Sequence, residues 1–147
     1  SSSLGRLFDA ASWLLTSITP TFEAHAAMHL EYVASRVDHA HGTTSAATSF
    51  PDLFMELLSP GDISERALRF HHGVARLLAA QLRVAAEAAG TRTIGVTGGC
   101  ALNRLLMRFL QDELADYHLL THHHVPANDG GLSLGQAVAG RRYASNQ

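Results

Sequence analysis

The sequence predicts a helix-rich α/β fold, and three observations lead to this expectation. Most of the chain repeats its apolar residues every three to four positions, as amphipathic helices do. A short β-branched run at residues 92–97 leads into a pair of glycines, and a second apolar run at residues 118–122 can form another short strand. Two short strands cannot build a complete nucleotide-binding sheet, so helices should dominate the fold.

Composition places the chain among globular domains. Its 147 residues, 46% of them hydrophobic, are enough to bury a core without a disulfide or a structural metal. No apolar run approaches the roughly 18 residues of a membrane span, and a net charge of -2 argues against a nucleic-acid-binding surface. Cys100 is the single cysteine, which fits a reducing compartment, so we expect a cytoplasmic protein. Because the chain starts at Ser1 without a methionine or a signal peptide, we expect it to be part of a longer protein.

The first half of the chain predicts three helical segments. The first begins at Gly5 and ends before Pro20, with apolar residues Leu7, Ala10, Ala11, Leu14 and Leu15 at helical spacing. The second lies within residues 21–39, with Thr21 as its expected cap and an apolar stripe of Phe22, Ala26, Leu30, Val33 and Val37. Residues 40–49 are small and polar and predict a loop, and residues 50–61 predict a short helical segment.

The longest predicted helix covers residues 62–89. Asp62 can cap it together with Glu65, and Gly90 stands where a glycine usually follows a helix. The apolar stripe consists of Ala67, Phe70, Val74, Leu77, Leu78 and Ala85. His71 falls beside Phe70 on the buried side, which favours a hydrogen-bonded histidine of the core or of an interface.

A strand, a glycine turn and a helix follow in the second half. The predicted strand leads into Gly98 and Gly99, and a helix is predicted over residues 100–117. Glycines let a phosphate approach the backbone, and the first N–H groups of the helix would favour an anion there. No lysine of a P-loop follows, and a plain tight turn is the alternative. Asn103 lies one turn into the helix, where it can bind a ligand or cap the helix locally.

Each of the other polar residues could have a functional or a purely structural role. Asp9 lies four residues after Gly5 on the same helix face and can accept ribose hydroxyls, or simply face solvent. The histidine run at residues 122–124 predicts a solvated loop, because neighbouring side chains diverge too far to share a metal ion. Cys100 lacks a recognisable partner base, which favours a packing role, although a helix N-terminus would lower its pKa. Asp129 lies in VPANDGG, a turn that leads into the last predicted helix.

Three motifs occur in one order and carry a family resemblance: SSSLGRLFDAASWLL, VTGGCALNRLLM and VPANDGGLSLGQAVAG. They resemble the C-terminal part of the HypF carbamoyltransferases, the maturation proteins of nickel-iron hydrogenases, within the Kae1/TsaD-like branch of the actin-like ATPase superfamily. TFEAHAAMHLE and RFHHGVARLLAAQL also resemble segments of that family. The resemblance implies that residues 1–147 form the C-terminal lobe of a Kae1-like domain, as a fragment of a longer protein.

The resemblance also implies roles for individual residues. Gly5 and Asp9 would contact the ribose of ATP, Gly98 and Gly99 would lie against its phosphates, and Asn103 would lie near the nucleoside. Asp129 would bind a metal ion at the phosphates, either a divalent or an iron-type ion. No catalytic nucleophile is implied.

Two features depart from the family pattern. The family's two metal-binding histidines in an H-x-x-x-H segment are expected in a lobe that precedes Gly5, so His25 and His29, which have the same spacing, receive no such role. The family's E-G-Q reads Glu23-Ala24-His25 here.

The function implied by the resemblance is carbamoyl transfer. Carbamoyl phosphate and ATP would form a carbamoyl-adenylate, and the carbamoyl group would pass to the C-terminal cysteine of a HypE-type acceptor protein. The isolated chain should be inactive. One alternative is a non-catalytic nucleotide-binding or scaffold lobe that docks through apolar surface, which also makes a homodimer of the fragment plausible. Another is a Kae1/TsaD-type tRNA threonylcarbamoyl transferase, which the missing basic character disfavours.

Overall fold

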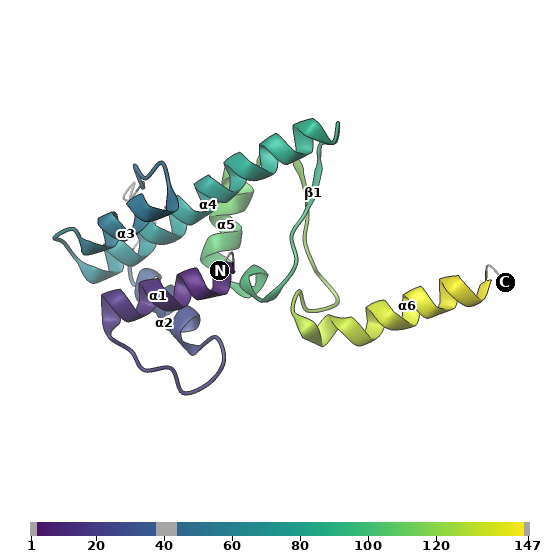
Figure 1. Cartoon of the computed structure of the whole chain (residues 1–147), viewed down its shortest axis with the longest axis horizontal. Coiled ribbons are helices and arrows are strands. Elements are labelled where there is room, and N and C mark those ends of the chain that lie inside the picture. Colours follow the sequence, from purple (N-terminus) through teal and green to yellow (C-terminus); the bar gives the residue numbers. More distant parts are fainter. Residues whose placement is uncertain (1–2, 38–43, 146–147) are drawn as a thin grey trace.

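The computed structural model describes residues 3–37 and 44–145, and in this part it shows a helical body with a small parallel sheet (Figure 1). The body contains α1 (Leu4–Thr16), α2 (His25–Ala34), α3 (Phe50–Leu58), α4 (Ile63–Ala88) and α5 (Arg104–Glu113). The strands are β1 (Thr93–Gly95) and β2 (His118–Leu120), and two short 3-10 helices, η2 (Gly99–Leu102) and η3 (Asp129–Gly131), precede α5 and α6 (Leu132–Ser145). The predicted helix-rich α/β class is confirmed.

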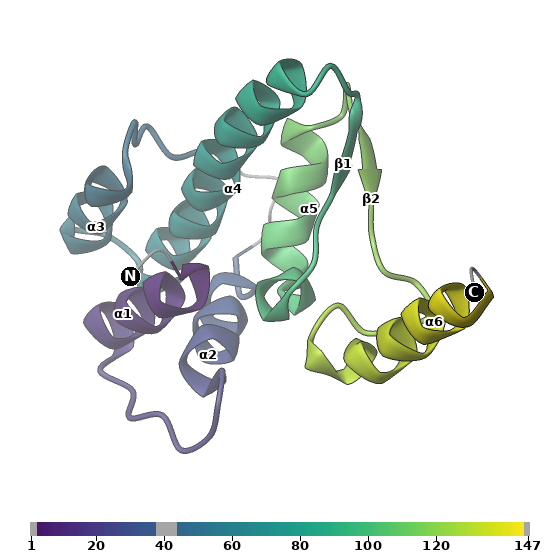
Figure 2. The ribbon, with the colours of Figure 1, turned by 45° about the vertical axis from the view of Figure 1, so that its right-hand side comes forward.

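α4 is the central element, and the other helices of the body pack around it. Figure 2 shows α5 lying along α4, with α1, α2 and α3 around its first half. The largest buried side chains belong to this packing: Phe8, Leu30, Leu53, Phe70, Val74, Leu110 and Leu114. Neither α4 nor another helix among the described residues is both long and apolar enough to cross a membrane.

The ends of α4 form as its sequence predicts. The Asp62 carboxylate accepts hydrogen bonds from the N–H groups of Ser64 (2.8 Å) and Glu65 (3.2 Å). These contacts satisfy amides that a helix start leaves without partners. Gly90 adopts a φ of 63°, the left-handed conformation in which helices commonly end.

The second helix differs from its prediction. α2 begins at His25, and Ala24 before it has a φ of 63°, so the helix cannot extend back to Thr21. Phe22 therefore lies outside the apolar stripe; it is 56% exposed and stacks on the His25 ring. Residues 44–49 form no helix or strand, as predicted. Residues 40–43 of the predicted loop and the predicted helix end at residues 38–39 lie outside the described residues.

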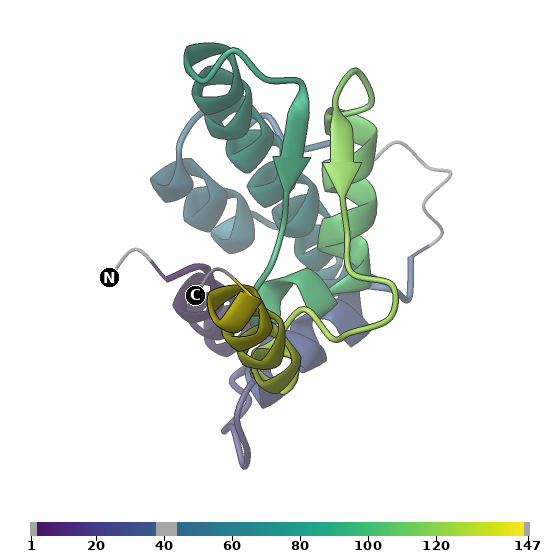
Figure 3. The ribbon, with the colours of Figure 1, turned by 90° about the vertical axis from the view of Figure 1, so that its right-hand side faces the viewer.

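The two strands pair in parallel, with Ile94 opposite Leu119 (Figure 3). Ile94 points into the core and is 6% exposed, whereas Thr93 and Gly95 on the other face are exposed. The described helices therefore cover one face of the sheet. Parallel sheets are usually covered on both faces, so this half-covered sheet is typical of a piece of a larger layered fold.

α6 projects away from the helical body (Figures 1 and 2). It has no buried residue, and its large apolar side chains are exposed: Leu132, Leu134, Val138 and Tyr143. The whole chain exposes 9319 Å², whereas a compact monomer of its mass exposes about 7,300 Å². The excess is comparable to the surface that one partner contributes to a large interface.

His71 is a polar residue in the middle of this core. Its side chain is fully buried, and the Phe8 ring packs on it at a centroid distance of 5.1 Å. Nδ1 lies 2.8 Å from the carbonyl oxygen of Ala67, and Nε2 lies 3.1 Å from Nδ2 of Asn103. The interpretation of His71 as a hydrogen-bonded core histidine is confirmed.

The buried imidazole predicts a loss of stability in acid. Burial lowers the pKa of His71 from 6.5 to about 4. Below pH 6.5 the unfolded chain gains a proton that the folded chain does not bind until about pH 4. We expect the free energy of unfolding to fall by about 3 kcal/mol across this window, since one pKa unit corresponds to about 1.4 kcal/mol. Urea unfolding of the wild type and of H71Q at several pH values isolates the contribution of His71 to the pH dependence of stability. If both proteins lost the same free energy of unfolding between pH 6.5 and pH 4, the lowered pKa of His71 would be contradicted.

Gly73 provides a test of the packing between α3 and α4. A Cβ at this position would lie 2.6 Å from Oγ of Ser45 and would also overlap the buried Leu53 side chain. We expect Gly73→Ala to destabilise the fold by about 1–3 kcal/mol, despite the better helix propensity of alanine. Gly135→Ala in α6 is the matched control, because its Cβ would meet nothing within 4 Å. A urea midpoint for Gly73→Ala at or above the wild-type value would rule out this packing.

Candidate functional site

The glycine turn after β1 is the first part of the candidate site. Gly98 has a φ of 100°, a conformation that residues with a Cβ rarely adopt. A Cβ on Gly98 or on Gly99 would meet no atom within 4 Å, so open space lies in front of both residues. The paired glycines thus form a turn whose backbone is accessible to another molecule.

Hydrogen bonds join this turn to the segment that carries Asp129. The N–H of Gly98 donates to the carbonyl oxygen of Ala127 (2.8 Å), and the Thr97 hydroxyl donates to the same oxygen (3.1 Å). His122 Nε2 lies 3.2 Å from that hydroxyl, which accepts its hydrogen bond. Because two residues span at most about 7 Å, Asp129 lies close to the contact between Gly98 and Ala127. The structure therefore brings together two motifs about thirty positions apart in sequence.

Two backbone amides at the turn are available to a ligand. The N–H groups of Gly99 and Cys100 have no hydrogen-bond partner within residues 3–37 and 44–145. They are consecutive and lie at the start of η2, beside the open space in front of the glycines. Adjacent free N–H groups of this kind can bind the oxygens of an anion such as a phosphate.

The start of α5, in contrast, already holds an anionic group of the protein itself. The Glu31 carboxylate from α2 accepts hydrogen bonds from the N–H groups of Arg104 (2.7 Å) and Leu105 (3.4 Å). Asn103 Oδ1 accepts the next one, from Leu106 (2.9 Å). The N–H groups at the start of α5 are therefore occupied by Glu31 and Asn103. The predicted helix began at Cys100, so the predicted anion site falls on the amides before α5, where it stays a prediction.

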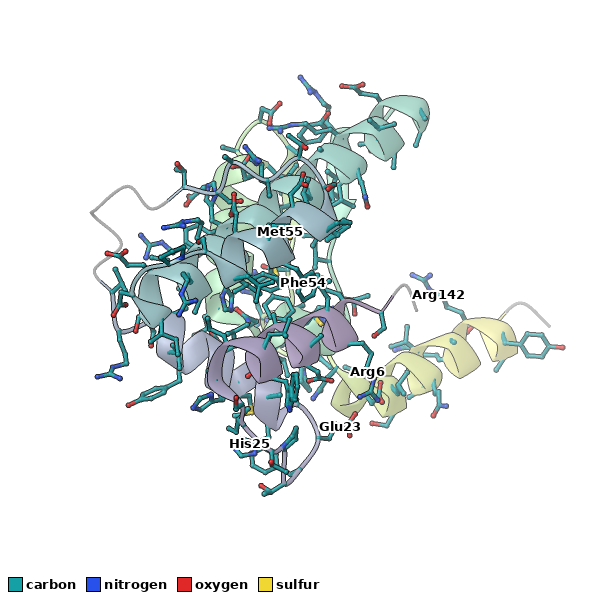
Figure 4. The ribbon with its side chains drawn as sticks, turned by 60° about the vertical axis from the view of Figure 1, so that its left-hand side comes forward. Arg6, Glu23, His25, Phe54, Met55 and Arg142 are labelled. Carbon is teal, nitrogen blue, oxygen red and sulfur yellow. The ribbon has the colours of Figure 1, made fainter. Side chains whose placement is uncertain are left out.

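α1 lies against η2 and supplies the two remaining N-terminal site residues. A Cβ on Gly5 would lie 4.0 Å from Sγ of Cys100, so the first turn of α1 touches the residue that follows the glycine pair. Asp9 is half-exposed and pairs with Arg6 through a contact of 3.2 Å; Arg6 lies at the surface in Figure 4. Burial raises the pKa of the Cys100 thiol, and the Asp9 charge adds to this effect. The expected lowering by a helix N-terminus is wrong, since Cys100 lies in a four-residue 3-10 helix and a carboxylate lies nearby.

Asn103 points into the core. It is 9% exposed, its Oδ1 bonds Leu106 N–H, and its Nδ2 bonds His71. Its backbone N–H closes η2 by donating to the Cys100 carbonyl oxygen (3.1 Å). Asn103 was expected either to bind a ligand or to cap the helix, and the structure shows the cap.

Asp129 begins η3 and is exposed. Its carboxylate makes no hydrogen bond or ion pair with the described residues, whereas the neighbouring Asn128 side chain accepts from Gly130 N–H (3.1 Å). No group of three or more His, Cys, Asp or Glu side chains in the described part is placed to share a metal ion. The described residues therefore offer one carboxylate ligand here, and a metal ion at Asp129 would need ligands beyond them.

Of the histidine-rich segments, residues 122–124 adjoin this site, since His122 bonds the Thr97 hydroxyl. His122, His123 and His124 are exposed on the loop after β2, as predicted, and line a cavity of about 350 Å³ with Met107 and Gln111 of α5. His25, labelled with Glu23 in Figure 4, accepts a hydrogen bond from the Thr21 N–H through Nδ1 (3.2 Å).

Two participants were not predicted from the sequence. Glu31 gave no signal, because a glutamate on an amphipathic helix is usually solvated. Thr97 precedes the glycine pair directly, and that position is the clue that could have indicated its contact with Ala127.

Comparisons with known proteins identify the family to which the chain belongs. The family model described as "Carbamoyltransferase, Kae1-like Domain, second subdomain" matches residues 1–136. The carbamoyltransferase HypF of Rhodobacter capsulatus is 38% identical over 152 residues, which cover 99% of this chain and 20% of that protein. The crystal structure of T. kodakarensis HypF has a TM-score of 0.81 and 26% identity, and the match covers 99% of this chain and 20% of that chain.

A structure of full-length HypF in the phosphate- and nucleotide-bound form gives the same TM-score of 0.81 and identity of 26%, over 97% of this chain and 20% of that chain. The chain thus spans about a fifth of the length of these relatives. The chain belongs to the HypF carbamoyltransferase family and corresponds to the second subdomain of its Kae1-like domain.

Proposed function

We propose that residues 1–147 form the C-terminal lobe of a longer carbamoyltransferase, in which this lobe binds the phosphates and ribose of ATP. One observation carries the proposal: the N–H groups of Gly99 and Cys100, which have no partner among the described residues, lie next to the hydrogen bond between Gly98 and Ala127. An anion-binding backbone and the Asp129 segment therefore share one edge of the molecule. The related full-length HypF was crystallised in a phosphate- and nucleotide-bound form, which supports the same ligand here.

The reaction we propose has two steps at ATP, after water has split carbamoyl phosphate into carbamate and inorganic phosphate. An oxygen of carbamate attacks the α-phosphate of ATP and pyrophosphate leaves, which gives a carbamoyl-adenylate. The thiol of a HypE-type acceptor's C-terminal cysteine then attacks the carbamoyl carbon, and AMP leaves. This chain supplies no nucleophile to either step. Its N–H groups stabilise negative charge on the phosphates, an electrostatic role that needs no covalent bond to the protein.

The remaining site residues have matching roles in this proposal. Gly5 lets the ribose approach α1, and the Asp9 carboxylate accepts hydrogen bonds from ribose hydroxyls. The Asn103 side chain is already bonded to His71 and to the Leu106 N–H. Asn103 therefore acts near the nucleoside by holding the backbone of η2 in place. Asp129 supplies one oxygen ligand to a divalent or iron-type cation, which offsets phosphate charge when bound.

The open surface fits a lobe of a larger domain. The uncovered face of the β1–β2 pair and the apolar side chains of α6 would be covered by the rest of the protein. When the chain is isolated, we expect the same surface to cause self-association, including a homodimer. The cytoplasmic location stays a prediction from the single cysteine.

Two alternative functions are compatible with the same nucleotide site. A scaffold lobe would bind ATP without any release of AMP. A tRNA threonylcarbamoyl transferase would act on nucleic acid, which the net charge of -2 does not favour. Assaying the full-length protein for carbamoyl-phosphate-dependent AMP release and, separately, for tRNA modification with a threonylcarbamoyl donor supplied distinguishes the three functions.

The role of Asp129 is tested by removing its charge. We expect Asp129→Asn in the full-length protein to lower carbamoyl-phosphate-dependent AMP release on the order of a hundredfold, because the cation at the phosphates loses a ligand. The fold should be unchanged, since Asp129 makes no contact that the described residues need. Asp112→Asn, an exposed aspartate of α5, is the matched control. Wild-type activity in Asp129→Asn would remove the proposed role.

The role of the glycine turn is tested by filling the space in front of it. Gly99 has no positive φ, and a Cβ added to it would meet no atom within 4 Å, so Gly99→Ala and Gly99→Val should both fold. We expect a graded rise in KM for ATP, small for alanine and about tenfold or more for valine, because small displacements in a binding site are costly. Circular dichroism checks the fold. An unchanged KM in Gly99→Val would place the phosphates elsewhere.

A further inference from the structure

His71 is buried, contacts no ligand in the proposed site, and yet is bonded to the residue that ends η2. It lies on α4, between the Phe8 ring of α1 and Asn103 at the start of α5. A hydrophobic residue would fill the same place without the cost of burying a polar ring. The position of His71 therefore points to a specific hydrogen-bonding role.

The hydrogen bonds around Asn103 fix which nitrogen of His71 carries the proton. Asn103 Oδ1 accepts from the Leu106 N–H, so its Nδ2 is the atom that faces His71. Nδ2 can only donate, so Nε2 of His71 is the acceptor and bears no proton. Nδ1 then carries the proton and donates to the Ala67 carbonyl oxygen (2.8 Å). All four side-chain groups are thus used in one consistent orientation.

These hydrogen bonds lead to η2, whose Gly99 and Cys100 N–H groups have no partner in the part of the chain that the structure describes. Asn103 closes η2 through its backbone N–H, which donates to the Cys100 carbonyl oxygen. At its other end, η2 is held by the bond between Gly98 and Ala127. A Cβ on Gly98 or Gly99 would meet no atom within 4 Å, so no neighbouring atom braces this side of the turn. The orientation of the Gly99 and Cys100 N–H groups therefore depends on where Asn103 is held.

We infer that His71 is a positioning residue for nucleotide binding: by accepting a hydrogen bond from Asn103 it holds η2 so that the Gly99 and Cys100 N–H groups meet the phosphates. The inference rests on the proposed function, and it assigns His71 no contact with the nucleotide. It requires an acceptor at the place of Nε2, and it does not require an imidazole.

The test compares His71→Leu with His71→Gln in the full-length protein. Leucine removes the acceptor and leaves Asn103 Nδ2 buried without a partner, whereas glutamine offers its Oε1 as a new acceptor. We expect KM for ATP to rise about tenfold in His71→Leu, with kcat within about twofold of wild type. His71→Gln should restore KM to within about twofold. His72→Gln is the matched control, because His72 instead accepts from the Ser45 N–H (3.3 Å).

A purely structural role gives a different result. His71→Leu would then lower the melting temperature and the active fraction, so kcat per mole of protein would fall while KM stayed at the wild-type value, and this outcome overturns the inference. A rise in KM that glutamine does not rescue also overturns it. If His71→Leu does not fold, His71→Met replaces it. Methionine fills similar space, and its sulfur accepts hydrogen bonds too weakly to replace Nε2.

The proposed function can fail separately. Wild-type protein that binds ATP in calorimetry but releases no AMP with carbamoyl phosphate contradicts carbamoyl transfer, and the same comparison is then made on the dissociation constant for ATP. A tenfold weaker binding in His71→Leu, restored by glutamine, still supports the inference. Wild-type protein that binds no ATP overturns both.

Discussion

The side-chain amide of Asn103 is the interaction on which the architecture of this lobe depends. Its oxygen caps α5, its nitrogen bonds His71 on α4, and the backbone N–H of the same residue closes η2. A buried amide can be satisfied in this way only if three separate elements stay in fixed positions. The order of the core and the order of the glycine turn are therefore coupled through a single residue.

The same region separates two kinds of backbone amide. Those at the start of α5 are bonded to Glu31 and Asn103, and the carboxylate of Glu31 also complements the positive end of the helix dipole. Those of Gly99 and Cys100, a few residues earlier, have no partner within the described ranges 3–37 and 44–145. In the proposed site, a carboxylate at α5 and an open turn before it would confine a bound phosphate to η2, with no P-loop lysine needed.

Local sequence signals predicted much of the fold, whereas contacts between distant segments were not predictable. Asp62 and Gly90 indicated the ends of α4 because capping depends on neighbours in the chain. Glu31 and the N–H of Arg104 are 73 positions apart, and no periodicity relates them. The pKa of Cys100 was predicted in the wrong direction because burial and Asp9, both set by tertiary packing, act on it. The open face of the sheet and the exposed α6 are equally properties of the assembled lobe.

The central claim is that the phosphates of ATP bind to η2 rather than to α5. A crystal structure of the full-length protein with an ATP analogue tests it most directly. We predict that phosphate oxygens lie within about 2.7–3.2 Å of the Gly99 and Cys100 nitrogens, with Glu31 still bonded to Arg104. Phosphate oxygens bonded instead to the Arg104 and Leu105 nitrogens, with Glu31 displaced, would contradict the account.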